Sequence, residues 1–325
     1  MRFLILLSLG LAAMIAVAVG LGETWLGPAQ ITRAFADPGS PPGEILWAIR
    51  APRAVAAAAV GAALGLSGAV MQGLLRNPLA DPAVLGVSAF AGLGAALVIA
   101  GGLAAAPGTV EAAALAGALV AGAAVALLAA RVREPEALIL FGVSLSAMGG
   151  AMTSLVFNLS PSPITTAEVL SWLMGSVANR DWGDLGAALV PGVVGAGLCA
   201  YAARGLRMLT LGEETAALSG LPMARLRAAA VAGAALLTGA AVAMAGVIGF
   251  VGLAAPHLVR RRVSDDPART LLPSALAGAV LLVAADLAAR MIPTDEELKL
   301  GVVTALFGAP LFGLVAWRAA RSWRA

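Results

Sequence analysis

The sequence predicts an all-α polytopic membrane protein with ten transmembrane helices. The chain is 60% hydrophobic and only 12% charged, and its mean hydropathy of +0.93 lies far outside the range of soluble proteins. Nearly all of its uncharged runs reach the ~20 apolar residues that a helix needs to cross a bilayer. Nine runs contain no Asp, Glu, Lys or Arg: 3–22, 54–75, 82–110, 112–130, 137–167, 185–203, 228–259, 270–285 and 300–317.

The run 228–259 is too long for one span. As a straight helix it would measure about 48 Å, against a hydrocarbon core of ~30 Å. Gly246, Gly249, Gly252 and Pro256 are places where this helix can break, because glycine loosens a helix and proline removes a backbone donor. Splitting this run gives ten spans in place of nine.

The distribution of positive charge favours ten spans with both termini in the cytoplasm. In that topology fifteen of the 21 Lys and Arg residues are cytoplasmic, whereas nine spans divide them ten against eleven. The six on the outer side are Arg33, Arg50, Arg53, Arg180, Arg290 and Lys299.

The elements follow in order from these runs. We expect spans at 3–21, 54–75, 83–104, 112–130, 137–158, 185–203, 224–246, 250–262, 270–290 and 300–318. The first could instead be a cleavable signal peptide, but its apolar stretch exceeds the usual length and no clear cleavage site follows. The eighth is short and broken, which is tolerated at membrane depth only inside protein or beside water.

Small residues at helical spacing predict close helix contacts within the bundle. They are the sets Gly61/Gly65/Gly68 and Gly142/Ser146/Gly149. The whole chain, 1–325, is expected to form a single transmembrane domain, with a cytoplasmic loop at 208–222 between the sixth and seventh spans.

Several chemistries are not expected of this chain. Cys199 is its single cysteine, so no disulfide or cysteine metal site is predicted. No G-x-x-x-x-G-K-[ST] motif is present, and no catalytic constellation accompanies the single histidine. We therefore expect neither an enzyme nor a metal protein, and we expect no nucleic-acid partner, because topology explains the basic residues.

Ordered motifs over about 270 residues resemble those of the FecCD family of ABC importer permeases for iron siderophores, haem and cobalamin. They include Arg50-Ala51-Pro52-Arg53, Asn77-Pro78-Leu79-Ala80-Asp81-Pro82, Trp172-Leu173-Met174-Gly175-Ser176, Leu211-Gly212-Glu213-Glu214, Gly249 to Arg260, Ala285 to Arg290 and Gly301 to Pro310. The resemblance implies the type II ABC importer permease fold in the bacterial cytoplasmic membrane. It implies a second copy of the chain and two ATP-binding subunits, which use ATP and Mg. It also implies a periplasmic or extracellular substrate-binding protein; no cofactor is expected on this chain.

The resemblance assigns a docking role to Arg50, Arg53 and Arg290. In the family, arginines at the matching positions bind glutamates of the substrate-binding protein, and a planar guanidinium suits such bidentate contacts. The alternative is interfacial snorkelling, with Asp286 as an i,i+4 partner of Arg290.

The resemblance also identifies the loop between the sixth and seventh spans as the coupling helix that contacts the ATPase. Gly212 to Leu218 is typical of a short helix with acids in its first turn, and an ordinary surface loop is the alternative. The residues assigned to coupling are Leu211, Gly212, Glu213, Glu214 and Ala217.

A polar stripe on the fifth span carries Ser144, Met148 and Asn158. In the family this helix lines the translocation path, and contacts between helices are the alternative. Six residues are interpreted as structural: Asn77, Pro78, Pro82, Gly249, Pro256 and His257. A metal or haem ligand at His257 is the less favoured hypothesis, because no Cys, Asp or Glu stands at ligand spacing.

A ten-helix secondary transporter of a small metabolite, driven by an ion gradient, is the rival interpretation. It would need inverted repeats, binding groups at the midplane and an ion-coupling acid. The sequence offers none of these convincingly. Dependence on ATP separates the two hypotheses.

Overall fold

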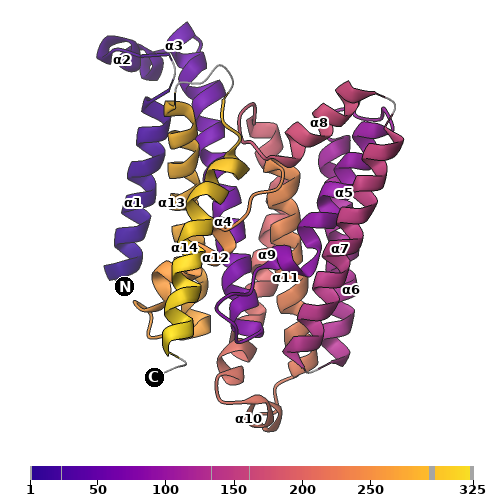
Figure 1. Ribbon diagram of the computed structural model, residues 1–325. Helices are drawn as coiled ribbons and strands as arrows, with labels where there is room; N and C mark the ends of the chain where they lie inside the picture. Colours follow the sequence, from indigo (N-terminus) through magenta and orange to yellow (C-terminus); the bar gives the residue numbers. More distant parts are fainter. Residues whose placement is uncertain (1, 23, 133, 161, 293–296, 323–325) are drawn as a thin grey trace.

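A computed structural model describes the chain except residues 1, 23, 133, 161, 293–296 and 323–325, and the side chains of 213, 311 and 315–322. The described residues form helices joined by turns and contain no strand. The helices run roughly side by side in one bundle, with α2, α3 and α8 at one end and α10 at the other (Figure 1). These are called the α2 end and the α10 end below.

Among the described residues, seven helices are long and apolar enough to cross a membrane. Five match predicted spans to within three residues at each end, and the other two begin or end further out. They are α1 (Arg2–Gly20), the continuous Pro41–Leu74 (α3, Pro41–Glu44; η1, Ile45–Arg50; α4, Ala51–Leu74), α6 (Thr109–Arg131), α7 (Pro135–Leu159), α9 (Trp182–Leu209), α11 (Met223–Ala245) and α13 (Pro267–Met291).

Three further helices stand at the other predicted spans. They are α5 (Val87–Ala100), α12 (Val251–Arg260) and α14 (Leu300–Ser322). The predicted break after α11 is confirmed: residues 246–250 leave the helix, with left-handed backbone at Gly246 (φ 68°) and Phe250 (φ 67°).

The predicted helix at 83–104 is wrong at its start. Residues 82–85 form the 3-10 helix η2, and α5 begins only at Val87. Two proline-containing turns precede it, and proline pushes its preceding residue out of the helical region. Asp81 caps η2 by accepting a hydrogen bond from the backbone N–H of Ala83 (2.7 Å).

The turn around Asn77 and Pro78 was expected on the cytoplasmic surface, but the chain after it runs deep into the bundle. A Cβ atom at Gly86 would lie 2.6 Å from that of Leu145, near the middle of α7. The Ser146 hydroxyl donates to the carbonyl oxygen of Val84 (3.1 Å). Irregular backbone is stable at this depth because protein surrounds it.

Three short or irregular elements were not predicted: α2 (Pro28–Ala36), α8 (Pro163–Leu173) and the π-helical turn η1. The α2 helix lies at one corner of the bundle, beyond the end of α1 (Figure 1). The Trp47 indole of η1 donates to the carbonyl oxygen of Ala34 (3.1 Å), and its ring meets Phe35 edge-on at 5.3 Å. Tryptophan at such a level is typical of a membrane interface.

The core forms around α4, which contacts α1, α9, α11, α12 and α13. The predicted small-residue contacts are confirmed. A Cβ atom at Gly61, Gly65 or Gly68 would overlap a backbone carbonyl oxygen of α13 or of Gly252 in α12. Because these backbones touch, α4 holds the broken helix α12 against the centre of the bundle.

Candidate functional site

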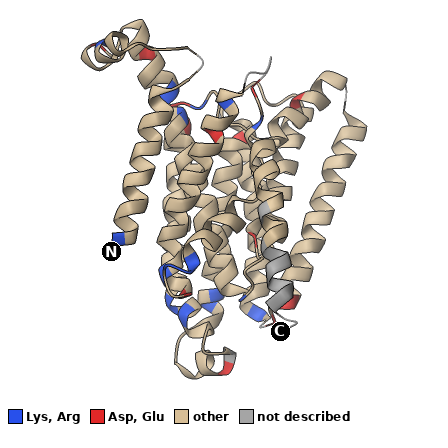
Figure 2. Cartoon of the chain, turned by 60° about the vertical axis from the view of Figure 1, so that its left-hand side comes forward, with Lys and Arg blue, Asp and Glu red and all other residues tan. Residues whose placement is uncertain are grey.

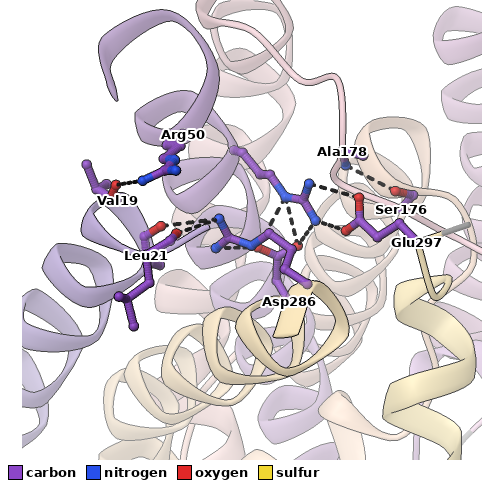
Figure 3. Close-up of polar contacts among 10 residues, drawn as sticks. Val19, Leu21, Arg50, Ser176, Ala178, Asp286 and Glu297 are labelled. Carbon is purple, nitrogen blue, oxygen red and sulfur yellow. Dashed lines mark hydrogen bonds and ion pairs between the residues drawn. The ribbon is translucent and has the colours of Figure 1, made fainter. Parts of the chain in front are cut away.

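The three arginines predicted to dock a partner lie at the α2 end, where η1 and α4 meet α13, and Arg53 and Arg290 both contact Asp286. Figure 3 shows Arg50 and Asp286 at this place. Arg50 is buried, and its guanidinium donates to the backbone carbonyl oxygens of Val19, Gly20 and Thr24. It thereby holds the end of α1 against η1. The hydrogen-bond donors of Arg50 are therefore directed at this chain's own backbone.

Arg53 and Arg290 share one buried carboxylate. Asp286 is 1% exposed and accepts from Arg53 Nη2 (2.8 Å) and Nε (3.1 Å). Arg290 Nη2 lies 3.0 Å from the other oxygen of Asp286, one turn earlier on α13. The i,i+4 pair that belonged to the alternative interpretation is thus present, and Asp286 also contacts Arg53, which lies 233 positions earlier in the chain.

A second acid, Glu297, completes this cluster, which we call the arginine cluster: Arg50, Arg53, Arg290, Asp286 and Glu297. Glu297 accepts from both terminal nitrogens of Arg53. Its side chain is 26% exposed, whereas that of Arg53 is 12% exposed. Three guanidinium groups against two carboxylates leave one positive charge, and Glu297 is the member most open to solvent. No sequence pattern had identified it.

The opposite end of the bundle carries the predicted coupling loop. Helix α10 (Glu213–Leu218) projects beyond the ends of α9 and α11 (Figure 1). A short helix was predicted here and is confirmed; the side chain of Glu213 lies outside the described residues. Gly212 precedes the helix with φ 99°, a conformation that favours glycine.

The surface of α10 is more apolar than the assigned residues suggested. Leu218 is 87% exposed and Leu211 is 61% exposed, while Glu214 and Ala217 are also exposed. Ala216 is buried and anchors the turn. Leu218 was missing from the predicted set, although an exposed leucine at the tip of a projecting loop is a strong candidate for a protein contact.

An ion pair ties the base of this loop to another helix. Arg207, near the end of α9, lies 3.0 Å from Asp266, which caps α13 by accepting from the backbone N–H of Ala268 (2.9 Å). Arg269 adds a second cation to Asp266 at 3.5 Å. Basic residues gather toward this end of the bundle (Figure 2).

The predicted path residues share the exposed face of α7. Ser144, Met148 (48% exposed) and Asn158 lie on it, and the buried stripe of Leu138, Gly142, Leu145 and Gly149 lies opposite. The Ser144 hydroxyl and the Asn158 amide donate to carbonyl oxygens one turn earlier in the same helix. This face therefore presents few free polar groups.

A broad apolar groove of about 640 Å³ lies beside α14. Its wall combines small side chains of α14 with the link after α8, and it includes Gly249. Backbone bonds fix this wall: Ser176 N–H donates to Ala245 O (2.8 Å) and Leu300 N–H donates to Gly175 O (2.9 Å). None of the residues that line the groove is charged, so it presents an apolar surface.

The residues interpreted as structural lie at the two broken segments. Asn77 Oδ1 accepts from the N–H of Leu79 (2.9 Å), and Pro82 and Pro256 are buried. Pro78 and His257 line one small cavity with Phe250 and Gly308. Among the described residues no three His, Cys, Asp or Glu side chains are grouped as a metal would need.

The model of the FecCD transport family matches residues 10–318 of the chain. The vitamin B12 import system permease proteins BtuC of Salmonella schwarzengrund and Salmonella typhimurium are both 40% identical over 323 residues, covering 97% of this chain and 95% of theirs. A solved structure described as an inward-facing conformation of a metal-chelate type ABC transporter superposes with a TM-score of 0.87. That structure is 32% identical and covers 98% of this chain and 99% of its own. The chain is a multi-pass protein of the bacterial inner membrane and belongs to the FecCD transport family.

Proposed function

We propose that this chain is the membrane-spanning subunit of an ATP-driven importer whose cargo is a corrinoid such as vitamin B12. The observation that carries the proposal is the 40% identity to vitamin B12 permeases along 97% of the chain. The wide apolar groove beside α14 suits a bulky cargo that is handed on without tight binding. Iron siderophores and haem are the alternative cargoes.

In the proposed topology ten elements cross the membrane, and both termini are cytoplasmic. The seven long helices, together with α5, α12 and α14, supply the ten. The concentration of basic residues toward the α10 end supports placing that end in the cytoplasm. The α2 end would then face outward.

The proposed complex contains two copies of this chain, two separate ATPase subunits and a substrate-binding protein. The unpartnered face of α7 and the groove beside α14 would form the path between the two copies. ATP binding and hydrolysis in the ATPases would move α10, and the paired permeases would open alternately to each side.

The arginine cluster is the proposed dock for the substrate-binding protein. Because Arg53 and Arg290 are paired internally, docking here takes the form of an exchange. A carboxylate of the partner would replace Glu297 on Arg53, while Asp286 keeps the guanidinium in position. In such an exchange the guanidinium of Arg53 stays paired with two carboxylates, one from Asp286 and one from the partner.

The test is uptake of radiolabelled cyanocobalamin into proteoliposomes that hold the purified permease and ATPase with the binding protein outside. We expect uptake to need ATP inside the vesicle and to resist an ionophore that collapses ion gradients. Excess unlabelled cobalamin should compete, whereas haem and ferric siderophore should not. Uptake driven by an ion gradient without ATP would overturn the importer, and competition by haem alone would overturn the cargo.

A further inference from the structure

An open space lies between α9 and its neighbours α4 and α11, along the half of α9 that is nearer the α2 end. The helix touches α11 near its middle, where a Cβ atom at Gly195 would lie 3.0 Å from Gly233 O. Nearer the α2 end, a Cβ atom at Gly186 or Gly192 would meet nothing within 4 Å. Pro191 interrupts the hydrogen bonding of α9 between these two glycines. The helix is thus close to its neighbour at the crossing and separated from it further out.

On the α4 side this open space forms a groove of about 520 Å³. Apart from Trp182, its lining is aliphatic or glycine and includes Ala59, Gly192, Leu237 and Met244. The outer surface of α9 beside it is also apolar, with Leu189, Val190 and Val193 each at least 61% exposed. A surface of this kind, on a helix able to span the membrane, faces acyl chains.

The end of the groove stands at the membrane interface. Trp182 lines it, is 52% exposed, and donates from its indole to the carbonyl oxygen of Trp47 (3.0 Å). Two tryptophans at one level are typical of the boundary between acyl chains and headgroups. A lipid in the groove would therefore have its headgroup near the first turn of α9.

Charged side chains occur at that level on the other side of α9. Arg180 Nη1 lies 3.0 Å from Glu111 of α6 and 3.6 Å from Asp184 of α9. All three side chains are partly exposed, at 19%, 33% and 32%. They line a pocket of about 260 Å³ that shares Ala188, Ala240 and Met244 with the apolar groove. The charged and apolar spaces therefore adjoin beneath α9.

We propose that this combined site binds one zwitterionic phospholipid with an ethanolamine headgroup, from the leaflet at the α2 end. Its phosphate would pair with Arg180 and its ammonium with Glu111 and Asp184, while an acyl chain fills the groove. Two acids beside one arginine give the pocket a net negative charge, which repels an anionic lipid and attracts the ammonium group of the headgroup. The arginine attracts the phosphate. These charges therefore select a headgroup that carries both a positive and a negative charge. A purely structural ion pair between α6 and α9 accounts for the contacts of Arg180 but predicts no preference among lipids.

The experiment is native mass spectrometry of delipidated protein titrated with an equal mixture of phosphatidylethanolamine and phosphatidylglycerol. We expect the wild type to retain one phosphatidylethanolamine per chain. Gly192→Leu places a side chain in open groove space, displaces about two methylene groups of the lipid and lowers retention about tenfold. Glu111→Gln combined with Asp184→Asn should abolish the preference between the two headgroups, because the acids that repel an anionic lipid and attract the ammonium are then neutral.

Gly197→Leu is the matched control, because Gly197 also lies on α9 with open space around its Cβ position but does not line the groove. Equal retention by Gly192→Leu and Gly197→Leu, or no headgroup preference in the wild type, would overturn the proposal. A phosphatidylethanolamine with a diazirine in its acyl chain should label peptides of α9 and α11 in the wild type, and labelling confined to other helices would also overturn it. These measurements need no cargo or ATPase, so they stand apart from the transport proposal.

Discussion

Neutralising Asp286 should destabilise the protein more than any other single change in the arginine cluster. Asp286→Asn preserves the shape of the side chain but removes the charge that Arg53 and Arg290 share. The carboxylate is 1% exposed, so water cannot replace it. Two largely buried guanidinium groups would then have Glu297 as their remaining acid in the cluster. Removing one partner of a buried ion pair costs about 3–5 kcal/mol of unfolding free energy.

The matched control is Glu297→Gln. Its carboxylate contacts the same Arg53, but its side chain is 26% exposed, so water can replace part of the lost contact and the cost should approach the ~1 kcal/mol of a solvent-accessible ion pair. The two substitutions therefore remove the same charge from neighbouring positions that differ in burial. We expect a large loss of stability for Asp286→Asn and little change for Glu297→Gln.

The single cysteine provides the assay. Cys199 is fully buried on α9, where it packs against Gly233 of α11. A thiol-reactive fluorogenic dye in mild detergent will therefore report the temperature at which this packing opens. An unchanged midpoint for Asp286→Asn, or a drop for Glu297→Gln as large as that for Asp286→Asn, would refute the reasoning from burial.

Three further predictions address docking, coupling and packing. Glu297→Gln should tighten binding of the substrate-binding protein up to about fivefold in surface plasmon resonance, because an internal competitor worth ~1 kcal/mol is removed; unchanged or weaker binding contradicts the exchange. Leu218→Asp should abolish co-purification of the ATPase subunit while Leu218→Met preserves it, and equal ATPase recovery from both variants would contradict the coupling role of α10. Gly68→Ala should lower the thermal midpoint, because its Cβ would overlap the carbonyl oxygen of Gly252 at a cost of about 1–3 kcal/mol. Gly150→Ala, which has open space, should not lower it, and equal midpoints would contradict the close packing of α4 and α12.

The sequence predicts the long helices well because each depends on a local property, an uncharged run of sufficient length. Helices α1, α7 and α13 begin and end within three residues of the predicted bounds. The break within 228–259 was predictable because this run is too long for one span and contains Gly246, Gly249, Gly252 and Pro256. The short helix α5 was overestimated, because hydropathy does not distinguish a buried turn from a buried helix.

The arginine cluster was only partly predictable. The i,i+4 pair of Asp286 and Arg290 follows from helical periodicity. The contacts of Arg53 with Asp286 and Glu297 join positions more than 230 residues apart, and no local pattern encodes them. The predicted topology placed the arginines on the outer side and the family resemblance made them candidate docks, whereas packing of α1 and α13 buries most of their surface. Whether they dock a partner stays a prediction.

The two broken segments at membrane depth bear on the choice between an importer and an ion-coupled carrier. A carrier built from discontinuous helices directs free helix ends and carbonyl groups at its substrate or ion. Here side chains of the same chain satisfy the break before α5: Asp81 accepts from Ala83 N–H, and Ser146 donates to Val84 O. The break before α12 is packed against α4 through Gly68 and Gly252. The break before α12 also contributes Val247 and Gly249 to the wall of the groove beside α14. Breaks that are packed in this way within the chain favour a permease whose cargo passes along its surface between two copies.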